Sequence, residues 1–271
     1  FELGETTDAG LEGLGELAQL RDLDLRSHDV TDAGMKHLAG LKSLQKLYID
    51  SRNVTDAGLR ELALLADLRE LYLSTEKVSG TGLAHLVGLK KLHRLDLSLG
   101  DVTVDGLGAI ARLQHLRSLD LTGARITDRG HFGPGIDDAG LRRLAKLKGL
   151  QSLNLNHVKV SDASLQAISA LTELQELTLV DTKITAASWK HFAGIKKLRT
   201  LHVGTQNRAT DADLKYVSGL TDLEELHLWH TELTDDGMNH LAGLTRLRDL
   251  TFQSTKFTGS GLKSLAGLKD L

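Results

Sequence analysis

Residues 44–67, LQKLYIDSRNVTDAGLRELALLAD, contain the pattern that the rest of the chain repeats. Leu47 and Ile49 alternate with polar residues, and this period of two predicts a strand with one buried face. Leucines spaced three positions apart from Leu59 to Leu65 predict a helical face. A unit this small buries its apolar face only against neighbouring copies, so the stretch predicts a stack of repeats.

A helix start lies between the predicted strand and helix, at Thr55 and Asp56. The threonine side chain can accept a hydrogen bond from a free backbone N–H, and the aspartate lies at the positive end of the helix dipole. The same pair recurs as Thr7-Asp8, Thr31-Asp32, Ser161-Asp162, Thr210-Asp211 and Thr234-Asp235. A glycine such as Gly58 often follows it. Glycine costs about 1 kcal/mol against alanine inside a helix, so its repetition predicts close approach of neighbouring helices.

The leucines that open the predicted strands recur along the whole chain. They are Leu20, Leu44, Leu68, Leu92, Leu116, Leu150, Leu174, Leu198, Leu223 and Leu247. This regularity predicts a single domain over residues 1–271, with a loop insertion at about 127–136. The terminal repeats are incomplete, because Phe1 and Leu3 align with the buried positions of a strand. Since solenoids need polar caps, we expect caps outside this sequence or partner contacts at the uncapped ends.

The repeated segment, Leu-x-x-Leu-x-Leu followed by Thr-Asp-Ala-Gly-Leu, resembles the leucine-rich repeat family over essentially the whole chain. It looks most like the bacterial repeats that are common in planctomycete-type proteins. The resemblance implies an α/β fold: a right-handed solenoid of about ten to eleven repeats of 24 residues. It also implies a concave parallel sheet, short helices on the convex side, and non-catalytic binding of another protein.

Composition and motifs exclude several classes of protein. The net charge of −3 argues against nucleic acid as a partner, because nucleic-acid-binding domains are strongly basic. The chain has no cysteine, and no apolar run approaches the roughly 18 residues that span a membrane. It has no Gly-x-Ser-x-Gly motif, and the glycine-rich run 130–135 lacks the lysine of a P-loop. We therefore expect neither catalytic residues nor a cofactor.

Polar and aromatic residues that flank the buried strand leucines are predicted to line the concave face. Tyrosine and tryptophan anchor interfaces more often than other residue types, so the aromatic positions favour a partner site there. The predicted partner-binding residues are Asp24, Tyr48, Tyr72, Asp96, Asp120, Phe132, His202, His227, Trp229 and His230. Phe132 belongs to the insertion, which we expect to be a rim loop. The alternative is a sheet face that is polar only because it meets water.

His202 and His227 occupy equivalent positions on adjacent predicted strands, about 4.8 Å apart. Two imidazoles can share a zinc ion, but zinc takes three or four ligands. His230 or Asp249 would have to complete the set, and neither is clearly aimed at the pair. The sequence alone therefore predicts no metal site.

These observations favour a non-catalytic scaffold that binds a protein partner on the concave face and at one rim loop. Two alternatives stay open. The chain is a structural or self-associating repeat element, as the uncapped ends suggest, or it is the targeting domain of a larger enzyme.

Overall fold

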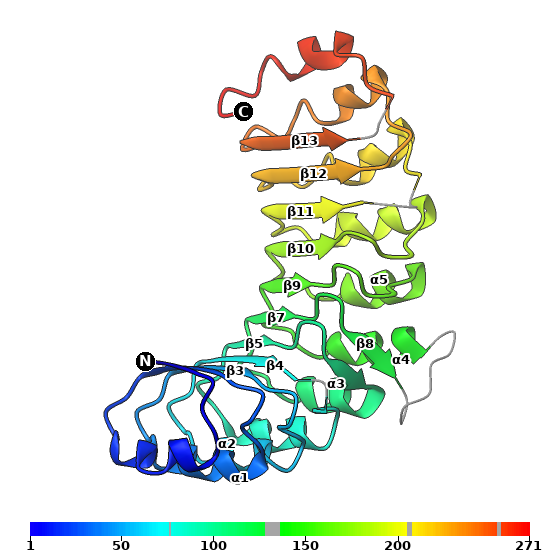
Figure 1. Ribbon diagram of the computed structural model, residues 1–271. Coiled ribbons are helices and arrows are strands. Elements are labelled where there is room, and N and C mark those ends of the chain that lie inside the picture. Colours follow the sequence, from blue (N-terminus) through cyan, green and yellow to red (C-terminus); the bar gives the residue numbers. More distant parts are fainter. Residues whose placement is uncertain (76, 128–135, 205–207, 254–255) are drawn as a thin grey trace. The chain divides into compact units, whose positions relative to one another are not determined.

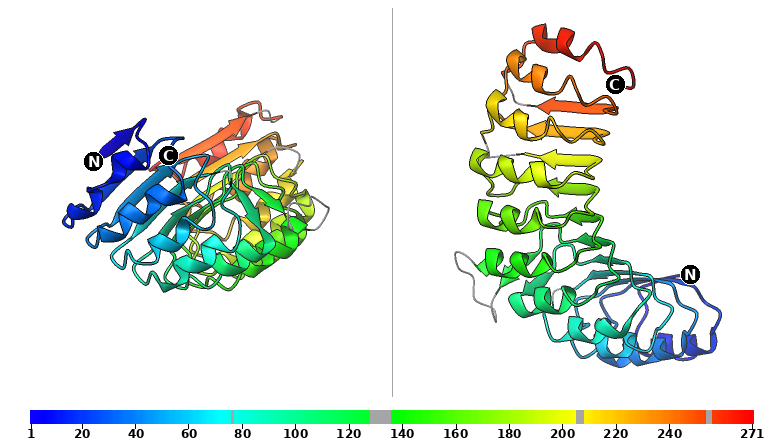
Figure 2. Two further views of the ribbon diagram at one scale, coloured as in Figure 1. Left: turned by 60° about the horizontal axis from the view of Figure 1, so that its bottom comes forward. Right: turned by 180° about the vertical axis from the view of Figure 1, so that it is seen from behind.

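The computed structural model describes residues 1–75, 77–127, 136–204, 208–253 and 256–271. They form two compact units, Phe1–Gly149 and Leu150–Leu271 (Figure 1). In both units each repeat contributes one strand to the main parallel sheet and one or two short helical segments. The helical segments of each unit stack along one side of its strands (Figures 1 and 2). The prediction of a single domain over the whole chain stays a prediction.

The first unit holds a parallel sheet whose strands follow one another in chain order. These strands are β1 (Glu2–Gly4), β2 (Asp22–Arg26), β3 (Lys46–Asp50), β4 (Glu70–Ser74), β5 (Arg94–Asp96) and β7 (Ser118–Asp120). The register joins equivalent positions of successive repeats, so Leu47 pairs with Leu71 and Leu3 pairs with Leu25. A second, two-stranded parallel sheet was not predicted; it consists of β6 (Asp101–Thr103) and β8 (Arg125–Thr127).

The second unit repeats the same arrangement. Its parallel strands are β9 (Ser152–Asn154), β10 (Glu176–Leu179), β11 (Thr200–Val203), β12 (Glu225–Trp229) and β13 (Asp249–Gln253). Leu201 pairs with Leu226, and both side chains are fully buried. The predicted parallel sheet, with one strand per repeat and short helices beside it, is confirmed.

The helical segments are short, as predicted, and many of them are 3-10 helices. In the first unit they are η1 (Ala9–Leu11), η2 (Leu14–Glu16), α1 (Asp32–Met35), η3 (Lys36–Gly40), α2 (Leu59–Leu62), η4 (Gly82–Gly88), α3 (Val104–Ile110) and α4 (Ile136–Leu144). In the second they are α5 (Asp162–Ile168), η5 (Ala186–Gly194), η6 (Asp211–Tyr216), η7 (Asp235–His240) and η8 (Ser260–Leu265). The η segments are 3-10 helices, in which side chains three residues apart lie above one another. Trp189, Phe192 and Ile195 have this spacing and are fully buried, which explains why the tighter helix suits the repeat.

Aspartates at the helix starts join several repeats to the following one. Asp32 accepts hydrogen bonds from the backbone N–H of Thr55 at 2.8 Å and from its hydroxyl at 2.7 Å. Thr55 Oγ1 in turn accepts the N–H of Ala57 in the turn that precedes α2, whereas the predicted cap is formed by Thr31, whose Oγ1 accepts the N–H of Ala33 at the start of α1. We call these contacts the Asp–Thr ladder. Equivalent pairs are Asp8 with Thr31, Asp56 with Ser79, Asp162 with Thr185, Asp211 with Thr234, and Asp235 with Thr258.

The repeated glycine makes room for this ladder. A Cβ atom at Gly58 would lie 2.4 Å from Asp32 Oδ1 of the preceding repeat, closer than the two atoms can approach. The predicted close approach is therefore real, although the nearest atom belongs to the ladder aspartate. Where Ala186 replaces the aspartate, the next helix start caps itself. There the backbone N–H of Thr210 donates to Asp213 of the same repeat at 2.8 Å.

The insertion falls largely outside the described residues. Strand β8 ends at Thr127 and helix α4 begins at Ile136, so the extra segment lies between a strand and a helix as expected. Phe132 and the predicted rim loop lie among residues 128–135, which the structure does not describe. Their role stays a prediction. In the part of the chain that is described, no helix combines the length and apolar character needed to cross a membrane.

Candidate functional site

The side chains between the buried strand leucines point away from the core, on the side of the sheet opposite the helical segments. We call this side the open face of each unit. Its central positions are half-buried in both units: Asp24, Tyr48, Tyr72, Asp96 and Asp120 in the first, and Asn154, Thr178, His202, His227 and Thr251 in the second. The open face thus offers polar and aromatic groups on a rigid sheet.

Tyr48 and Tyr72 lie side by side on β3 and β4, with ring centroids 6.2 Å apart. Three cations cover them. The Arg26 guanidinium lies 4.8 Å from the centre of the Tyr48 ring, whereas Lys46 and Arg94 lie 5.3 and 5.4 Å from that of Tyr72. Cations within about 6 Å of an aromatic face are attracted to its electron density. We call these five residues the tyrosine patch.

The environment of the tyrosine patch keeps both phenols protonated. Burial raises the pKa of Tyr48, and it raises the pKa of Tyr72 to about 12 with help from Glu70. The Tyr72 hydroxyl donates to Glu70 Oε2 at 2.8 Å. A groove of about 530 Å³ runs along the patch, lined by Phe1, Asp22, Leu23, Asp24, Arg26, Lys46, Tyr48 and Tyr72. The patch therefore combines apolar rings, cations and a recess.

The three predicted acidic residues of the first unit are each held by a neighbour on their own strand or the residues just after it. Asp24 forms a paired interaction with Arg26, at 2.9 and 2.8 Å. Asp96 Oδ1 accepts the hydroxyl of Ser98 at 2.6 Å. Asp120 Oδ1 accepts both the hydroxyl and the backbone N–H of Thr122, at 2.6 and 2.8 Å. Asp120 Oδ1 also accepts the hydroxyl of Ser98 from the preceding repeat, at 3.3 Å.

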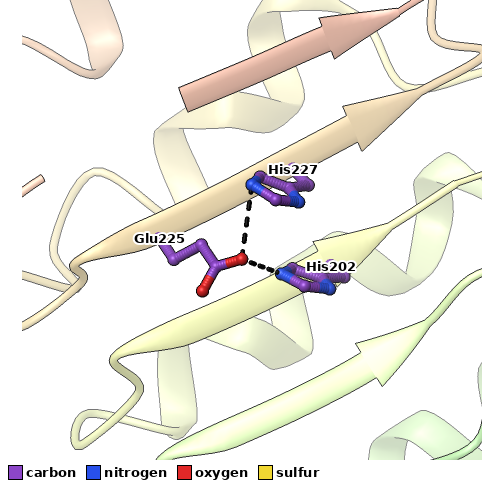
Figure 3. A group of neighbouring side chains, drawn as sticks. All are labelled: His202, Glu225 and His227. Atoms are coloured by element: carbon purple, nitrogen blue, oxygen red, sulfur yellow. Dashed lines mark hydrogen bonds and ion pairs between the residues drawn. The ribbon is translucent and has the colours of Figure 1, made fainter. Parts of the chain in front are cut away.

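His202 and His227 lie on β11 and β12 with parallel rings, 7° between planes and 4.3 Å between centroids. Glu225 lies between their Nε2 atoms (Figure 3). Its Oε1 accepts a hydrogen bond from His202 Nε2 at 2.7 Å and lies 3.3 Å from His227 Nε2. Asp249 Oδ1 lies 3.1 Å from the same His227 nitrogen. We call these four residues the histidine cluster.

Trp229 lies beside the histidine cluster, with its ring edge-on to both imidazoles. Its ring centroid lies 5.8 Å from that of His202 and 5.4 Å from that of His227. The His202 and His227 side chains are 21% and 17% exposed. His202, Glu225 and His227 bring potential ligand atoms within 4.8 Å of one another, and they form the metal-compatible group found among the described residues. His227 Nε2 is buried and, within the same residues, makes no hydrogen bond.

Sequence reasoning missed Glu225 and included His230. Glu225 precedes His227 by two positions, and a period of two along the strand would have placed both on the same face. His230 follows the end of β12, is exposed, and has a left-handed backbone with φ of 53°. It is not among the residues of the histidine cluster. The structure thus joins His202, His227 and Trp229 and leaves His230 outside.

Comparisons with known proteins agree with this architecture. A family model described as a leucine-rich repeat matches residues 19–39, 88–111 and 112–130. No curated protein sequence is significantly similar to the chain. An internalin from Listeria monocytogenes is 23% identical, with 98% of this chain and 88% of that chain covered and a TM-score of 0.60.

Two further solved structures have the same kind of fold. A leucine-rich repeat protein from Leptospira interrogans is 18% identical over 98% of this chain and 81% of that chain, with a TM-score of 0.55. A plant peptide hormone receptor in complex with RGF2 is 16% identical over 99% of this chain and 52% of that chain, with a TM-score of 0.52. At these identities the likeness concerns the fold.

Proposed function

Because this chain is a leucine-rich repeat protein, we propose that it is a non-catalytic scaffold that binds another protein through the open face of its sheet. The observation that carries the proposal is the tyrosine patch. Two aromatic rings lie half-buried on a face that the chain's own helices do not cover, beside a groove of about 530 Å³. Aromatic residues in such recesses are typical anchors of protein interfaces.

The arrangement of polar groups supports a binding surface over a catalytic one. On the open face of the first unit, the acidic residues are tied to local donors, and the cations lie over tyrosine rings. Such groups offer shape and charge to a partner. The similar receptor structure, which is described as a complex with RGF2, is compatible with a ligand held by this fold. In the second unit, Trp229 lies half-buried on that unit's own open face.

Capture of partners from the source cells tests the proposal. The untagged chain, immobilised through one surface amine, is compared with a variant that carries both Tyr72→Ala and Trp229→Ala. We expect the variant to lose the captured protein, because truncation of an aromatic anchor typically costs 2 kcal/mol or more, roughly thirtyfold in affinity.

A matched control is Thr178→Ala, which changes a half-buried central position of the same face without removing an aromatic ring. It should retain the partner. Solution mass is measured for each protein, because a concentration-dependent oligomer would identify the captured protein as a second copy. If the captured protein is not a second copy of this chain and the double variant retains it fully, binding through the open face is contradicted.

A further inference from the structure

We propose that the histidine cluster binds a zinc ion, with His202, Glu225 and His227 as ligands and Asp249 as the fourth. The proposal does not depend on the protein-binding function. It begins with the ligand chemistry. Neutral imidazole and carboxylate are the nitrogen and oxygen ligands that zinc takes in proteins, in four-coordinate tetrahedral sites. The cluster supplies two of each.

The distances within the cluster match the scale of such a site. Zinc binds imidazole nitrogen at about 2.0–2.1 Å and carboxylate oxygen at about 2.0–2.2 Å, so neighbouring ligand atoms of a tetrahedron lie roughly 3.4 Å apart. Glu225 Oε1 lies 2.7 and 3.3 Å from the two Nε2 atoms, and Asp249 Oδ1 lies 3.1 Å from that of His227. Each of these three distances therefore needs to grow by less than an ångström.

His227 provides the strongest reason to place a cation here. Its Nε2 is buried and lies within 3.3 Å of two carboxylate oxygens, yet no hydrogen bond joins it to any described residue. A buried polar atom that makes no hydrogen bond destabilises the folded protein. A hydrogen-bonded polar cluster explains the contact between His202 and Glu225 but leaves this nitrogen unsatisfied, whereas a shared cation satisfies it.

Binding requires a rotation of the imidazoles. The rings are parallel, so their Nε2 lone pairs do not meet at one point until one or both rings turn about the side-chain torsions. The cluster lies on the solvent side of β11 and β12, and Glu225 and Asp249 are 34% and 59% exposed. The carboxylates can therefore follow the rings. Asp249 is the more exposed of the two acids.

Imidazole also selects the class of metal. Nitrogen ligands favour zinc and its first-row neighbours, whereas calcium and magnesium take oxygen ligands almost alone. We therefore expect zinc and cobalt to bind, and calcium and magnesium to leave the cluster unchanged. Zinc binding at His202 Nε2 requires this nitrogen to give up the hydrogen that it donates to Glu225, and the proton passes to Nδ1 or to solvent, so that the ligand is a neutral imidazole.

Isothermal titration of the untagged chain with zinc chloride at neutral pH tests the site. We expect one equivalent to bind, and Glu225→Gln, His202→Gln and His227→Gln each to weaken binding at least tenfold, since even an outer-shell change costs about 10–100-fold. Cobalt should give the strong visible bands of a tetrahedral ion in the unaltered protein and lose them in these variants.

His230→Asn is the matched control. It removes a histidine from the end of the same strand, and asparagine tolerates the left-handed backbone at this position. Zinc affinity should not change in this variant. Circular dichroism without metal establishes that each variant is folded, and if His227→Gln does not fold, the Glu225 and His202 variants decide. Equal zinc affinity in folded Glu225→Gln and His202→Gln, or the absence of binding in the unaltered chain, would overturn the proposal.

Discussion

The tyrosine patch and the histidine cluster are built on the same plan and offer different chemistry. Tyr48 pairs with Tyr72, and His202 pairs with His227, at equivalent positions of adjacent parallel strands. The tyrosine rings are tilted by 31° with centroids 6.2 Å apart, whereas the histidine rings stack at 4.3 Å. In each case two like rings from neighbouring repeats meet because the repeat places them at the same height.

The difference comes from the residues two positions earlier on the strands. Beside the tyrosines this column carries Lys46, Glu70 and Arg94. The two cations lie over the Tyr72 ring, and Glu70 accepts the hydrogen bond of the Tyr72 hydroxyl. Beside the histidines it carries Glu225 and Asp249, whose oxygens approach a ring nitrogen. The central residue of a repeat therefore does not define the surface of that repeat alone. The flanking column decides whether an aromatic pair offers a face to a cation or a nitrogen to a metal.

The largest expected effect concerns the scaffold that the two surfaces share. Leu71 and Leu226 are fully buried at equivalent positions beneath them. Leu71→Ala and Leu226→Ala should each lower stability by about 2–5 kcal/mol, because a void in a stacked core is filled only by the two neighbouring repeats. Urea unfolding followed by circular dichroism measures the loss.

Leu64→Ala is the control for both core variants, because its side chain is 51% exposed and should change stability by less than about 0.5 kcal/mol. If a core variant behaves like this control, then the two surfaces do not rest on equivalent cores. The packing of the core would then differ beneath the tyrosine patch and beneath the histidine cluster.

A smaller effect is expected from the Asp–Thr ladder, which both units contain. Burial raises the pKa of Asp56, but hydrogen bonds from Thr81 and Ser79 outweigh it and lower the pKa overall. The folded carboxyl is thus more acidic than the unfolded one, near 3.9. Its contribution is complete above about pH 4 and is lost as the pH falls through the folded pKa. Asp56→Asn should cost about 1–2 kcal/mol at pH 6.

Urea midpoints between pH 6 and pH 2 test this prediction, and the Asp56→Asn curve should be the flatter one. Asp67→Asn serves as a comparison, since Asp67 makes an exposed ion pair with Lys91 at 2.6 Å and contributes less. Equal pH dependence in the unaltered protein and in Asp56→Asn would show that the ladder does not contribute to acid stability.

The smallest effect is expected in the tyrosine patch and concerns the pKa of Tyr72. Burial and the hydrogen bond to Glu70 raise the pKa of Tyr72 to about 12. The neutral phenol therefore stabilises the fold fully below the unfolded value near 10, and this contribution is lost as the pH rises through about 12. Glu70→Gln should lower the pKa of Tyr72 towards its ordinary value. Absorbance titration at alkaline pH, with Tyr72→Phe to assign the transition, measures the change; an unchanged titration would exclude Glu70 as a cause.

The strands and their register followed from the sequence, because period-two leucines in repeats of constant length admit one pairing. The expected contact between His202 and His227 has the same origin. The helices were predicted less well, since Trp189, Phe192 and Ile195 have a spacing of three that suits both an α-helix and a 3-10 helix. Tertiary packing decides between the two.

The contacts around each ring pair were harder to predict. The sequence places Glu225 on the open face, but whether its carboxylate bends towards an imidazole depends on side-chain torsions that no periodicity specifies. The ladder was hidden for a related reason. A helix-start aspartate has a sufficient local explanation in the helix dipole, and its bond to a threonine 23 residues later becomes visible only when the repeats are stacked.

The Asp–Thr ladder also determines which segment of the chain can be duplicated without loss of hydrogen bonds. A segment that runs from Asp32 through Thr55 carries a carboxylate and the threonine that the carboxylate binds. A second copy of this segment, inserted in tandem, would again carry both partners of the hydrogen bond. Duplication therefore lengthens such an array without leaving a donor or acceptor unmatched. At Ala186 the same operation would require the copied unit to bring the self-capping pair of Thr210 and Asp213. The hydrogen bonds between repeats thus determine which segments of the chain can be duplicated in tandem.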